Sequence, residues 1–363
     1  MRLSDLFRET IEPALALQAA DGSFPAGRNG PYGDQETPVR NTAHWLITLL
    51  HAHQLAGDAR CLDAARRAAE YLMRPELRPA GATYLCRIGS QRDQCNGLIG
   101  QAWVIEALAT AASRLGEPRY AALARELFLL HPFDEQAGLW RCVEVDGSRG
   151  GFDTTFNHQL WFAASGALLE PSREDAVAAR VLRFLDQTLA SHLRIDPSGR
   201  ISHFVPAPRR SLARRLLSRA LQPIRRLRQK PHQIRKEIGY HAFNLYAFAL
   251  LQRQFPDHPL WRSRKLLKAL RFVERPEYVA GLEDNAYGFP YNPPGFEVAF
   301  AMQTFAGAFR ASERTDAWWV SQQLRRAYDP ATRLLTRQTA DRHTLAARLY
   351  EATRLRDMEV GLA

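Results

Sequence analysis

The chain has 363 residues, 46% of them hydrophobic, and a formal net charge of +11. It contains no run of about 18 apolar residues that could span a bilayer, and residues 1–8 lack the apolar core of a signal peptide. The four cysteines show no metal-ligand spacing and no disulfide framework, so we expect reduced thiols in a cytoplasmic protein.

Helical periodicity dominates the chain, and the alternation typical of strands is nearly absent. A first amphipathic helix is predicted at residues 3–18, and a last helix at 342–355. Five helix pairs are predicted between them, at 42–56 with 59–73, 97–115 with 118–130, 157–169 with 173–192, 240–253 with 258–274, and 296–311 with 314–328.

In each pair the first helix is apolar on nearly every side, as in residues 98–105, and the second is amphipathic. A helix that is hydrophobic all round must be buried, so each pair predicts an inner and an outer helix. Helices 3–18 and 342–355 would supply a sixth pair by packing together. The predicted fold is therefore an all-α (α/α)6 toroid of six helical hairpins, in which residues 1–363 form a single domain closed by the N- and C-terminal helices.

The net charge comes from one segment. Residues 209–236 hold 11 of the 49 basic side chains and no acidic one, so the other 38 balance the 38 acidic residues. We predict a basic amphipathic insertion at about 206–236. Its Arg209–Lys236 segment would bind the anionic surface of a membrane and so place the protein peripherally at the inner membrane face. The alternative is that this segment is a solvated loop. The lack of interleaved aromatic residues argues against nucleic acid as a partner.

Each inner helix begins with a cluster of hydrogen-bonding or aromatic side chains, and the loops that lead into these clusters are long. Helix starts that share one end of a ring would line one pocket, and loops of this length are usually functional. Asn41 and Asp341 are explained as N-caps. Capping does not explain the other side chains, which we predict to be substrate contacts: His44, Asn96, Gln101, Asn157, His158, Tyr240, His241, Tyr291 and Glu297.

A polar and aromatic pocket predicts a saccharide, because sugar rings stack on aromatic faces and planar polar groups bind hydroxyls. Asp93 and Asp153 each precede an inner helix and are predicted as the catalytic carboxylates, with an N-cap role as the alternative. No side-chain cluster has convincing metal spacing, so we expect no metal and no cofactor. Further candidates for proton transfer or anion binding are His203, His343, Arg40, Arg92 and Arg342.

The run Phe152-Asp153-Thr154-Thr155-Phe156-Asn157-His158-Gln159-Leu160-Trp161 resembles the Asp-x-x-x-Asn segment of unsaturated glucuronyl hydrolases and related six-hairpin glycosidases. The resemblance implies a glycoside hydrolase-like enzyme for a uronic-acid-containing saccharide. In this family the aspartate that matches Asp153 is the general acid/base, which protonates C4 of a 4,5-unsaturated uronate and then helps to activate water for addition at C5. The second family aspartate matches either Asp93 or, since the local sequence departs from the family pattern, Asn96.

Two other functions stay open. Similar (α/α)6 folds serve N-acylglucosamine 2-epimerases, polysaccharide lyases and the helical domain of glucuronyl C5-epimerases, so the resemblance fixes a substrate class better than a reaction. The first alternative is a sugar (uronate) epimerase or isomerase in polysaccharide or lipid-linked glycan biosynthesis. The second is a toroid that binds a saccharide without catalysis.

Overall fold

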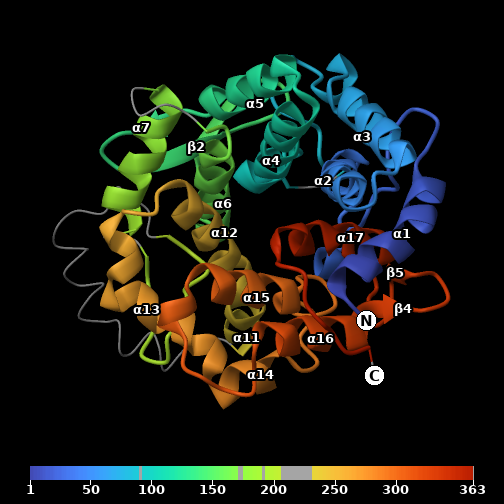
Figure 1. The fold of residues 1–363 in the computed structure, drawn as a ribbon. Helices are drawn as coiled ribbons and strands as arrows, with labels where there is room; N and C mark the ends of the chain where they lie inside the picture. The colour runs from blue at the N-terminus through green and yellow to red at the C-terminus, as the bar shows by residue number, and fades with distance from the viewer. Residues whose placement is uncertain (90–91, 171–174, 190–192, 206–230, 363) are drawn as a thin grey trace.

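A computed structural model describes residues 1–89, 92–170, 175–189, 193–205 and 231–362, and its helices form a ring (Figure 1). In this described part, each inner helix packs on the next one around the ring, and a 3₁₀ helix that continues α17 packs on both α15 and α2. The predicted toroid is confirmed. The inner elements are α2 (Val39–Ala56), α4 (Gly97–Leu115), α6 (Phe156–Ala167), α12 (His241–Gln254), α15 (Pro294–Thr304), α17 (Arg342–Ala347) and the 3₁₀ helix Arg348–Arg354.

Other helices lie outside this ring or lead into it: α1 (Leu3–Leu17), α3 (Ala59–Leu72), α5 (Pro118–Leu130), α7 (Ala176–Arg183), α11 (Pro231–Gly239), α13 (Arg264–Leu270), α14 (Pro276–Leu282) and α16 (Asp316–Ala327). The predicted outer helix 258–274 is divided, because the Ser263 side chain accepts a hydrogen bond from the Leu266 amide and so caps a new helix. The predicted helix 173–192 is also interrupted, since α7 passes into a π-helical turn at Phe184–Leu189.

Short strands are more numerous than the sequence predicts. β1 (Phe133–Asp134), β2 (Leu139–Val143) and β3 (Arg149–Phe152) form an antiparallel sheet in that order, and β4 (Tyr328–Asp329) pairs with β5 (Leu334–Leu335). Strands of two to five residues are too short for an alternating pattern to stand out. β3 matters for function, because it ends directly before Asp153.

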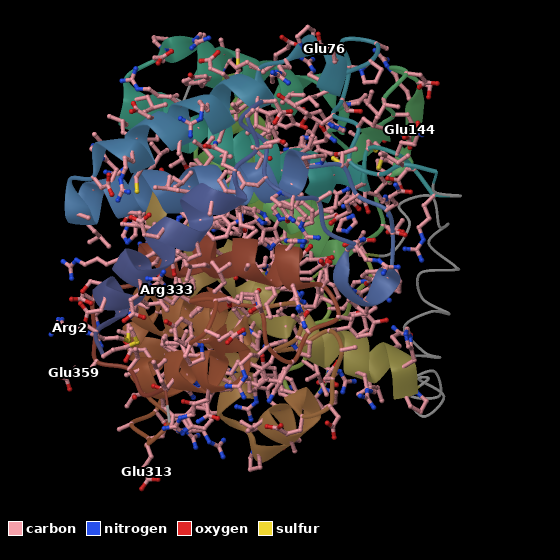
Figure 2. All side chains as sticks on the ribbon, turned by 90° about the vertical axis from the view of Figure 1, so that its right-hand side faces the viewer. Arg2, Glu76, Glu144, Glu313, Arg333 and Glu359 are labelled. Carbon is pink, nitrogen blue, oxygen red and sulfur yellow. The ribbon has the colours of Figure 1, made fainter. Side chains whose placement is uncertain are left out.

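The two chain ends lie side by side, as Arg2 and Glu359 show in Figure 2. The Leu3 amide donates a hydrogen bond to the Met358 carbonyl at 2.9 Å. α1 packs on α2 and α3, while the 3₁₀ helix Arg348–Arg354 completes the inner ring against α2. Backbone hydrogen bonds therefore join the two chain ends, while the inner elements close the ring itself.

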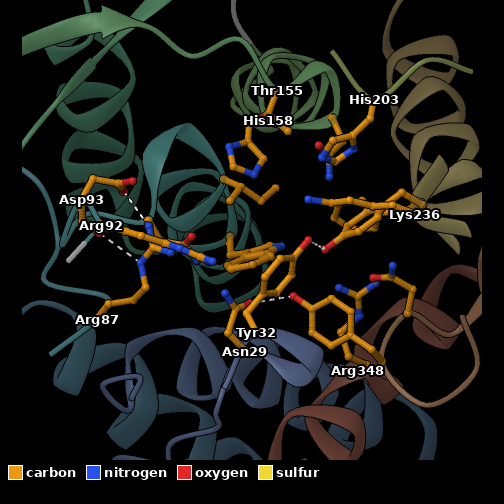
Figure 3. Close-up of a pocket in the computed structure, with 18 residues that line it drawn as sticks. Asn29, Tyr32, Arg87, Arg92, Asp93, Thr155, His158, His203, Lys236 and Arg348 are labelled. Carbon is orange, nitrogen blue, oxygen red and sulfur yellow. Dashed lines mark hydrogen bonds and ion pairs between the residues drawn. The ribbon is translucent and has the colours of Figure 1, made fainter. Parts of the chain in front are cut away.

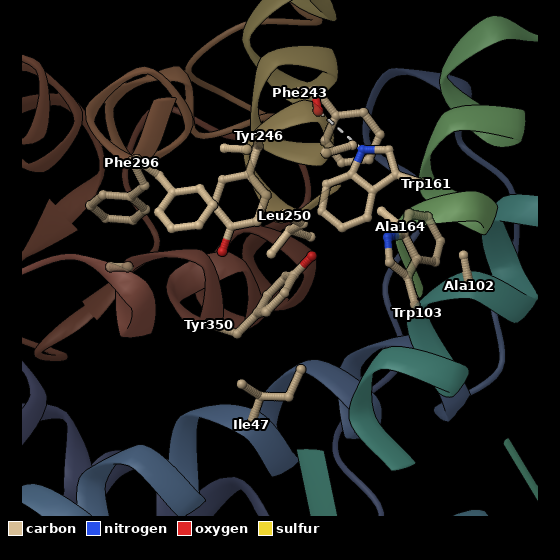
Figure 4. Close-up of a cluster of buried hydrophobic side chains, with 14 of the residues drawn as sticks. Ile47, Ala102, Trp103, Trp161, Ala164, Phe243, Tyr246, Leu250, Phe296 and Tyr350 are labelled. Carbon is tan, nitrogen blue, oxygen red and sulfur yellow. Dashed lines mark hydrogen bonds between the residues drawn. The ribbon is translucent and has the colours of Figure 1, made fainter. Parts of the chain in front are cut away.

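The core lies inside the ring, where the inner helices meet (Figure 4). Trp161 of α6 stacks on Phe243 and Tyr246 of α12 with ring centroids 4.5 and 5.5 Å apart, and its Nε1 donates to the Phe243 carbonyl. Full burial of one large apolar side chain contributes roughly 1.5–3 kcal/mol. Within the described ranges, no helix combines the length and the apolar composition needed to cross a membrane.

The basic insertion falls mostly on residues 206–230, which lie outside the described residues. Its last residues are described: Arg235 and Lys236 belong to α11, which leads into α12. Arg235 donates to the Asp284 carbonyl, and Lys236 reaches the cavity described below.

Candidate active site

A cavity of about 200 Å³ lies at the end of the ring where the inner helices begin (Figure 3). Its wall includes the first turns of α4, α6 and α12, together with Tyr32 from the loop before α2. The predicted convergence of polar helix starts therefore exists. Of the predicted catalytic residues and substrate contacts, the cavity is lined by Asp93, Asn96, Asn157, His158, Tyr240 and Tyr291, and of the further candidates by Arg92 and His203.

Three other predicted contacts are buried framework residues outside the cavity wall. Gln101 accepts a hydrogen bond from the Tyr84 amide and donates to the Cys95 carbonyl, both at 2.9 Å. His241 donates from Nε2 to the Ala269 carbonyl at 2.9 Å and accepts the Ile201 amide. His44 is fully buried and stacks on Tyr350 with ring centroids 4.2 Å apart. These residues hold the loops and helices that shape the cavity.

Asp153 lies directly behind His158, and its Oδ2 is 2.8 Å from the imidazole Nδ1. The backbone amides of Thr155 and Leu98 also donate to this carboxylate, at 3.0 and 3.2 Å. Burial by itself would raise the pKa of Asp153, but the charge and hydrogen bond of His158 and the two amides lower it to about 2. Asp153 is therefore an anion at neutral pH and orients the histidine ring.

The other ring nitrogen of His158 is the one available to a ligand. Because Nδ1 donates its hydrogen to Asp153, a neutral ring carries a lone pair on Nε2. His158 lines the cavity, and 24% of its side chain is exposed. An aspartate that fixes the tautomer of a histidine is an arrangement that produces a general base.

Asp93 and Asp153 converge on the first turn of α4. Asp93 accepts the Gly97 amide at 2.5 Å and pairs with Arg87 at 2.8 Å, while Asp153 accepts the adjacent Leu98 amide. The positive end of the helix dipole favours two carboxylates at this place. Gly97 has a φ of +56°, and a Cβ added there would lie 2.6 Å from Asp153 Oδ2. A residue with a Cβ at this position would press on Asp153 and on its partner His158.

Cationic side chains dominate the cavity wall. Among the described lining residues, Asp93 is the acidic one, and four are basic: Arg87, Arg92, Lys236 and Arg348. The Lys236 ammonium lies 5.0 Å from the centre of the Tyr32 ring. Burial, and then the charge of Arg92, lower the pKa of Lys236 to about 8. An ammonium group with this pKa can donate a proton near neutral pH.

Two further uncharged groups can form hydrogen bonds with a ligand. His203 lines the cavity, and burial together with the charges of Lys236 and His158 lowers its pKa to about 2, so this ring stays neutral. The buried Oδ1 of Asn157 has no hydrogen-bond partner in the described part of the chain. A buried acceptor without a partner costs free energy, and a ligand hydroxyl would satisfy it.

Sequence reasoning missed Lys236 and Arg348 as lining residues. Lys236 was grouped with the basic insertion, although its place three residues before the Gly239-Tyr240-His241 helix start connects it to the pocket. Arg348 stands in the apolar run Leu345–Tyr350, where a buried arginine is itself a signal.

Glu297 is also buried and lies behind Arg348, at 2.8 Å, outside the cavity wall. Of the predicted arginines, Arg92 lines the cavity, Arg40 pairs with buried Glu36 at 3.3 Å, and Arg342 is exposed, as is His343.

One trio of potential metal ligands occurs in the described residues. Donor atoms of Asp93, Cys95 and Glu144 lie within 4.8 Å of one another. Asp93 is already bound by Arg87 and the Gly97 amide, and burial raises the pKa of the Cys95 thiol, so it keeps its proton. The protein's own contacts account for this trio, and we assign no metal to it.

Comparison with known proteins shows one long sequence relationship and a shared fold. The chain is 46% identical over 378 residues to archaeal glycosylation protein Q of Haloferax volcanii, with 99% of both chains covered. No family model matches it. The cellobiose 2-epimerase of Spirochaeta thermophila superposes with a TM-score of 0.66 and 15% identity, over 97% of this chain and 94% of the other. A heparin-specific unsaturated glucuronyl hydrolase gives 0.62 and 12%, over 96% of both chains. The fold is thus that of the six-hairpin (α/α)6 enzymes.

Proposed function

The chain belongs to the family of archaeal glycosylation protein Q, and we propose that it is a carbohydrate-processing enzyme that transfers protons at a carbon atom of an acidic saccharide. The observation that carries this proposal is the hydrogen bond between Asp153 and His158 at the cavity wall. His158 is the base in this account, and Asp153 is its positioning residue. The reaction class is that of a sugar epimerase or isomerase.

The proposed proton transfer needs a base and an acid that both reach the substrate. His158 Nε2 takes the proton from a C–H bond next to a carboxylate or carbonyl, and the electron pair of that bond delocalises into the neighbouring C=O group. The Lys236 ammonium then returns a proton to the same carbon. His158 and Lys236 come from α6 and α11, on different sides of the cavity (Figure 3), which suits removal and return on different faces of the sugar.

The substrate class is proposed from the charge of the cavity. Arg87, Arg92, Lys236 and Arg348 would attract an anionic sugar, and a guanidinium binds a carboxylate through two parallel hydrogen bonds. Neutralising a uronate carboxylate also makes its α-hydrogen more acidic, which helps His158 to remove it. A glycosylation protein among the relatives supports a role in glycan assembly, with a uronate-containing saccharide as the substrate.

Hydrolysis is the second candidate, because two carboxylates meet at the start of α4 and the Asp153–Asn157 segment resembles a hydrolase motif. A glycosidase needs one carboxyl group that carries a proton. The low pKa of Asp153, about 2, leaves it without a proton at neutral pH, so Asp93 would have to be the acid. A toroid that only binds the saccharide remains the third candidate, and peripheral association with the inner membrane face through Arg209–Lys236 remains a proposal.

Two products separate these candidates. Incubation with glucuronate-containing oligosaccharides in deuterated water should introduce deuterium at a sugar carbon without cleavage of a glycosidic bond. Cleavage without deuterium at a carbon next to a C=O group would favour hydrolysis, and binding with neither product would favour the non-catalytic toroid.

A further inference from the structure

Arg348 is a fully buried cation of the cavity wall, and two glutamates lie behind it. Its Nη2 is 2.8 Å from Glu297 Oε1 and 2.7 Å from Glu351 Oε1, and all three side chains are at most 1% exposed. The same nitrogen donates to Asn292 Oδ1 at 3.3 Å, and the guanidinium carbon lies 4.9 Å from the centre of the Phe243 ring. The Nε of Arg348 has no hydrogen-bond partner in the described part of the chain.

The charges around Arg348 do not balance if both glutamates are ionised. One guanidinium then faces two carboxylates in a buried site, and two like charges in one buried site cannot both persist. Burial and the negative charge of Glu351 raise the pKa of Glu297, and burial is the main cause that raises the pKa of Glu351 to about 7. The free protein therefore keeps at least one proton on the Glu297–Glu351 pair near neutral pH.

Titratable groups from every neighbouring element face this pair or its arginine. The groups are Arg40 and His44 of α2, Glu106 of α4, Tyr246 of α12, Tyr278 of α14, and Tyr350 and Arg354 of the 3₁₀ helix. Burial, aided by the positive charges of Arg40 and Arg348, lowers the pKa of His44 well below its usual value, so it stays neutral. Glu106 is bound by Arg354 at 2.8 Å. The glutamate pair is thus the group in this cluster that is poised to change charge near neutral pH.

We propose that Arg348 binds the carboxylate of the substrate and that the Glu297–Glu351 pair takes up a proton from solvent when it does so. This inference rests on the proposed function, because it requires an acidic saccharide in the cavity. The arriving carboxylate adds a negative charge to a guanidinium that already balances one glutamate. The glutamate that is ionised in the free protein takes up a proton, which restores neutrality, and no bond in the sugar changes. Arg348 is then a specificity residue, and Glu351 is a positioning residue that acts through it.

The test measures proton uptake during binding. Isothermal titration calorimetry with methyl β-D-glucuronide at about pH 8, in buffers of different ionisation enthalpy, reports the protons taken up, because each one must come from the buffer. We expect up to about one proton for the wild type. Methyl β-D-glucoside has the same ring without the carboxylate, and it should bind about tenfold more weakly or worse, with no proton uptake.

Glutamine variants identify the group that takes up the proton. The double variant Glu297→Gln, Glu351→Gln keeps the shapes of both side chains but cannot be protonated there, so the glucuronide should still bind with a proton uptake lower than that of the wild type by up to about one. Any proton taken up by Lys236 is common to both proteins. Either single glutamine variant leaves one glutamate on Arg348 and should retain the uptake, and the wild-type comparison of glucuronide with glucoside keeps the test valid if the double variant does not fold. Glu36→Gln is the matched control, because Glu36 is a buried carboxylate on another arginine, Arg40, outside the cavity wall; it should retain the wild-type proton uptake.

The possible failures are distinguishable. Glucuronide binding by the wild type without any buffer dependence, or unchanged proton uptake in the double glutamine variant, would overturn the inference and leave the proposed function standing. Equal affinity for glucuronide and glucoside would overturn the role of Arg348. Absence of glucuronide binding to the wild type would overturn both, because the cavity would then not accept an acidic sugar.

Discussion

Nδ1 of His158 lies 2.8 Å from Oδ2 of Asp153, at the junction where β3 passes into α6. The bond joins a buried carboxylate to a histidine that reaches the cavity, and it turns the free Nε2 of the ring towards ligands. The Leu98 amide of the neighbouring helix α4 holds the same carboxylate oxygen. Two inner helices of the ring thus cooperate to build one base.

Asp153→Asn should reduce turnover by about 10²- to 10⁴-fold while the substrate affinity stays nearly constant. The neutral amide of asparagine cannot hold His158 in the tautomer that the carboxylate fixes, so the base is misoriented and weakened. Steady-state kinetics would measure kcat and KM separately. Asp146→Asn is a suitable control, because Asp146 caps an exposed turn through the Ser148 amide. Wild-type turnover in Asp153→Asn would contradict the proposed role.

Gly97→Ala should abolish most activity, although the change adds a single methyl group. The positive φ at this position costs a residue with a Cβ about 1–2 kcal/mol, and the methyl group would push Asp153 Oδ2 away from its bond with His158. Gly57→Ala separates these two effects, since Gly57 also has a positive φ but its Cβ would meet nothing within 4 Å. Gly57→Ala should lose only the stability that the positive φ costs, whereas Gly97→Ala should lose more stability in thermal unfolding and should also lose activity.

The pH profile should show an alkaline limb that belongs to Lys236. Burial and Arg92 lower the pKa of this ammonium to about 8, so it loses its proton as the pH rises through that value. If the ammonium is the acid, kcat falls above about pH 8. Lys236→Arg keeps the positive charge, but its guanidinium does not release a proton in this pH range, so this variant should lose most of its turnover at every pH. A rate that rises through pH 8 would instead make Lys236 a base and contradict the assignment.

Arg348→Met should destabilise the protein by about 3–5 kcal/mol, because it leaves Glu297 and Glu351 buried without their cation. Urea unfolding followed by circular dichroism would measure the loss. The triple variant Arg348→Met, Glu297→Gln, Glu351→Gln removes the charges together and should recover much of the stability. A loss of the same size in both variants would show that packing of the arginine, and not charge, controls stability.

Much of the ring was predictable because its inner helices are apolar on every side. The bounds of α4 and α5 agree with the predicted 97–115 and 118–130, and Gly57, with a φ of +67°, ends α2 as expected of a C-cap. Strands such as β3 and the division around α13 were missed, because single turns and short strands depend on contacts across the chain that periodicity does not record.

The candidate site was predictable in its location and less so in its members. His158, Asp153 and Tyr240 stand at helix starts, where polar residues were expected to converge. His241 was selected by the same criterion, yet its ring points into the helix packing and bonds to the Ala269 carbonyl. Which face of a first turn meets the cavity depends on the rotation of the helix. A sequence that is apolar all round contains no marker for that rotation, and Arg348 was missed for a related reason, since it enters from the interior of a helix.

Deuterium incorporation tests the central claim most directly. Wild-type protein, His158→Ala and His53→Ala would be incubated with glucuronate-containing oligosaccharides in deuterated water, and the sugars examined by NMR and mass spectrometry. His53 is a matched control, because its Nδ1 bonds to the Asp58 carbonyl far from the cavity residues. The account predicts deuterium at one sugar carbon with the wild type and His53→Ala, none with His158→Ala, and intact glycosidic bonds in every case. Equal incorporation with His158→Ala, or cleaved saccharide without deuterium at carbon, would contradict it.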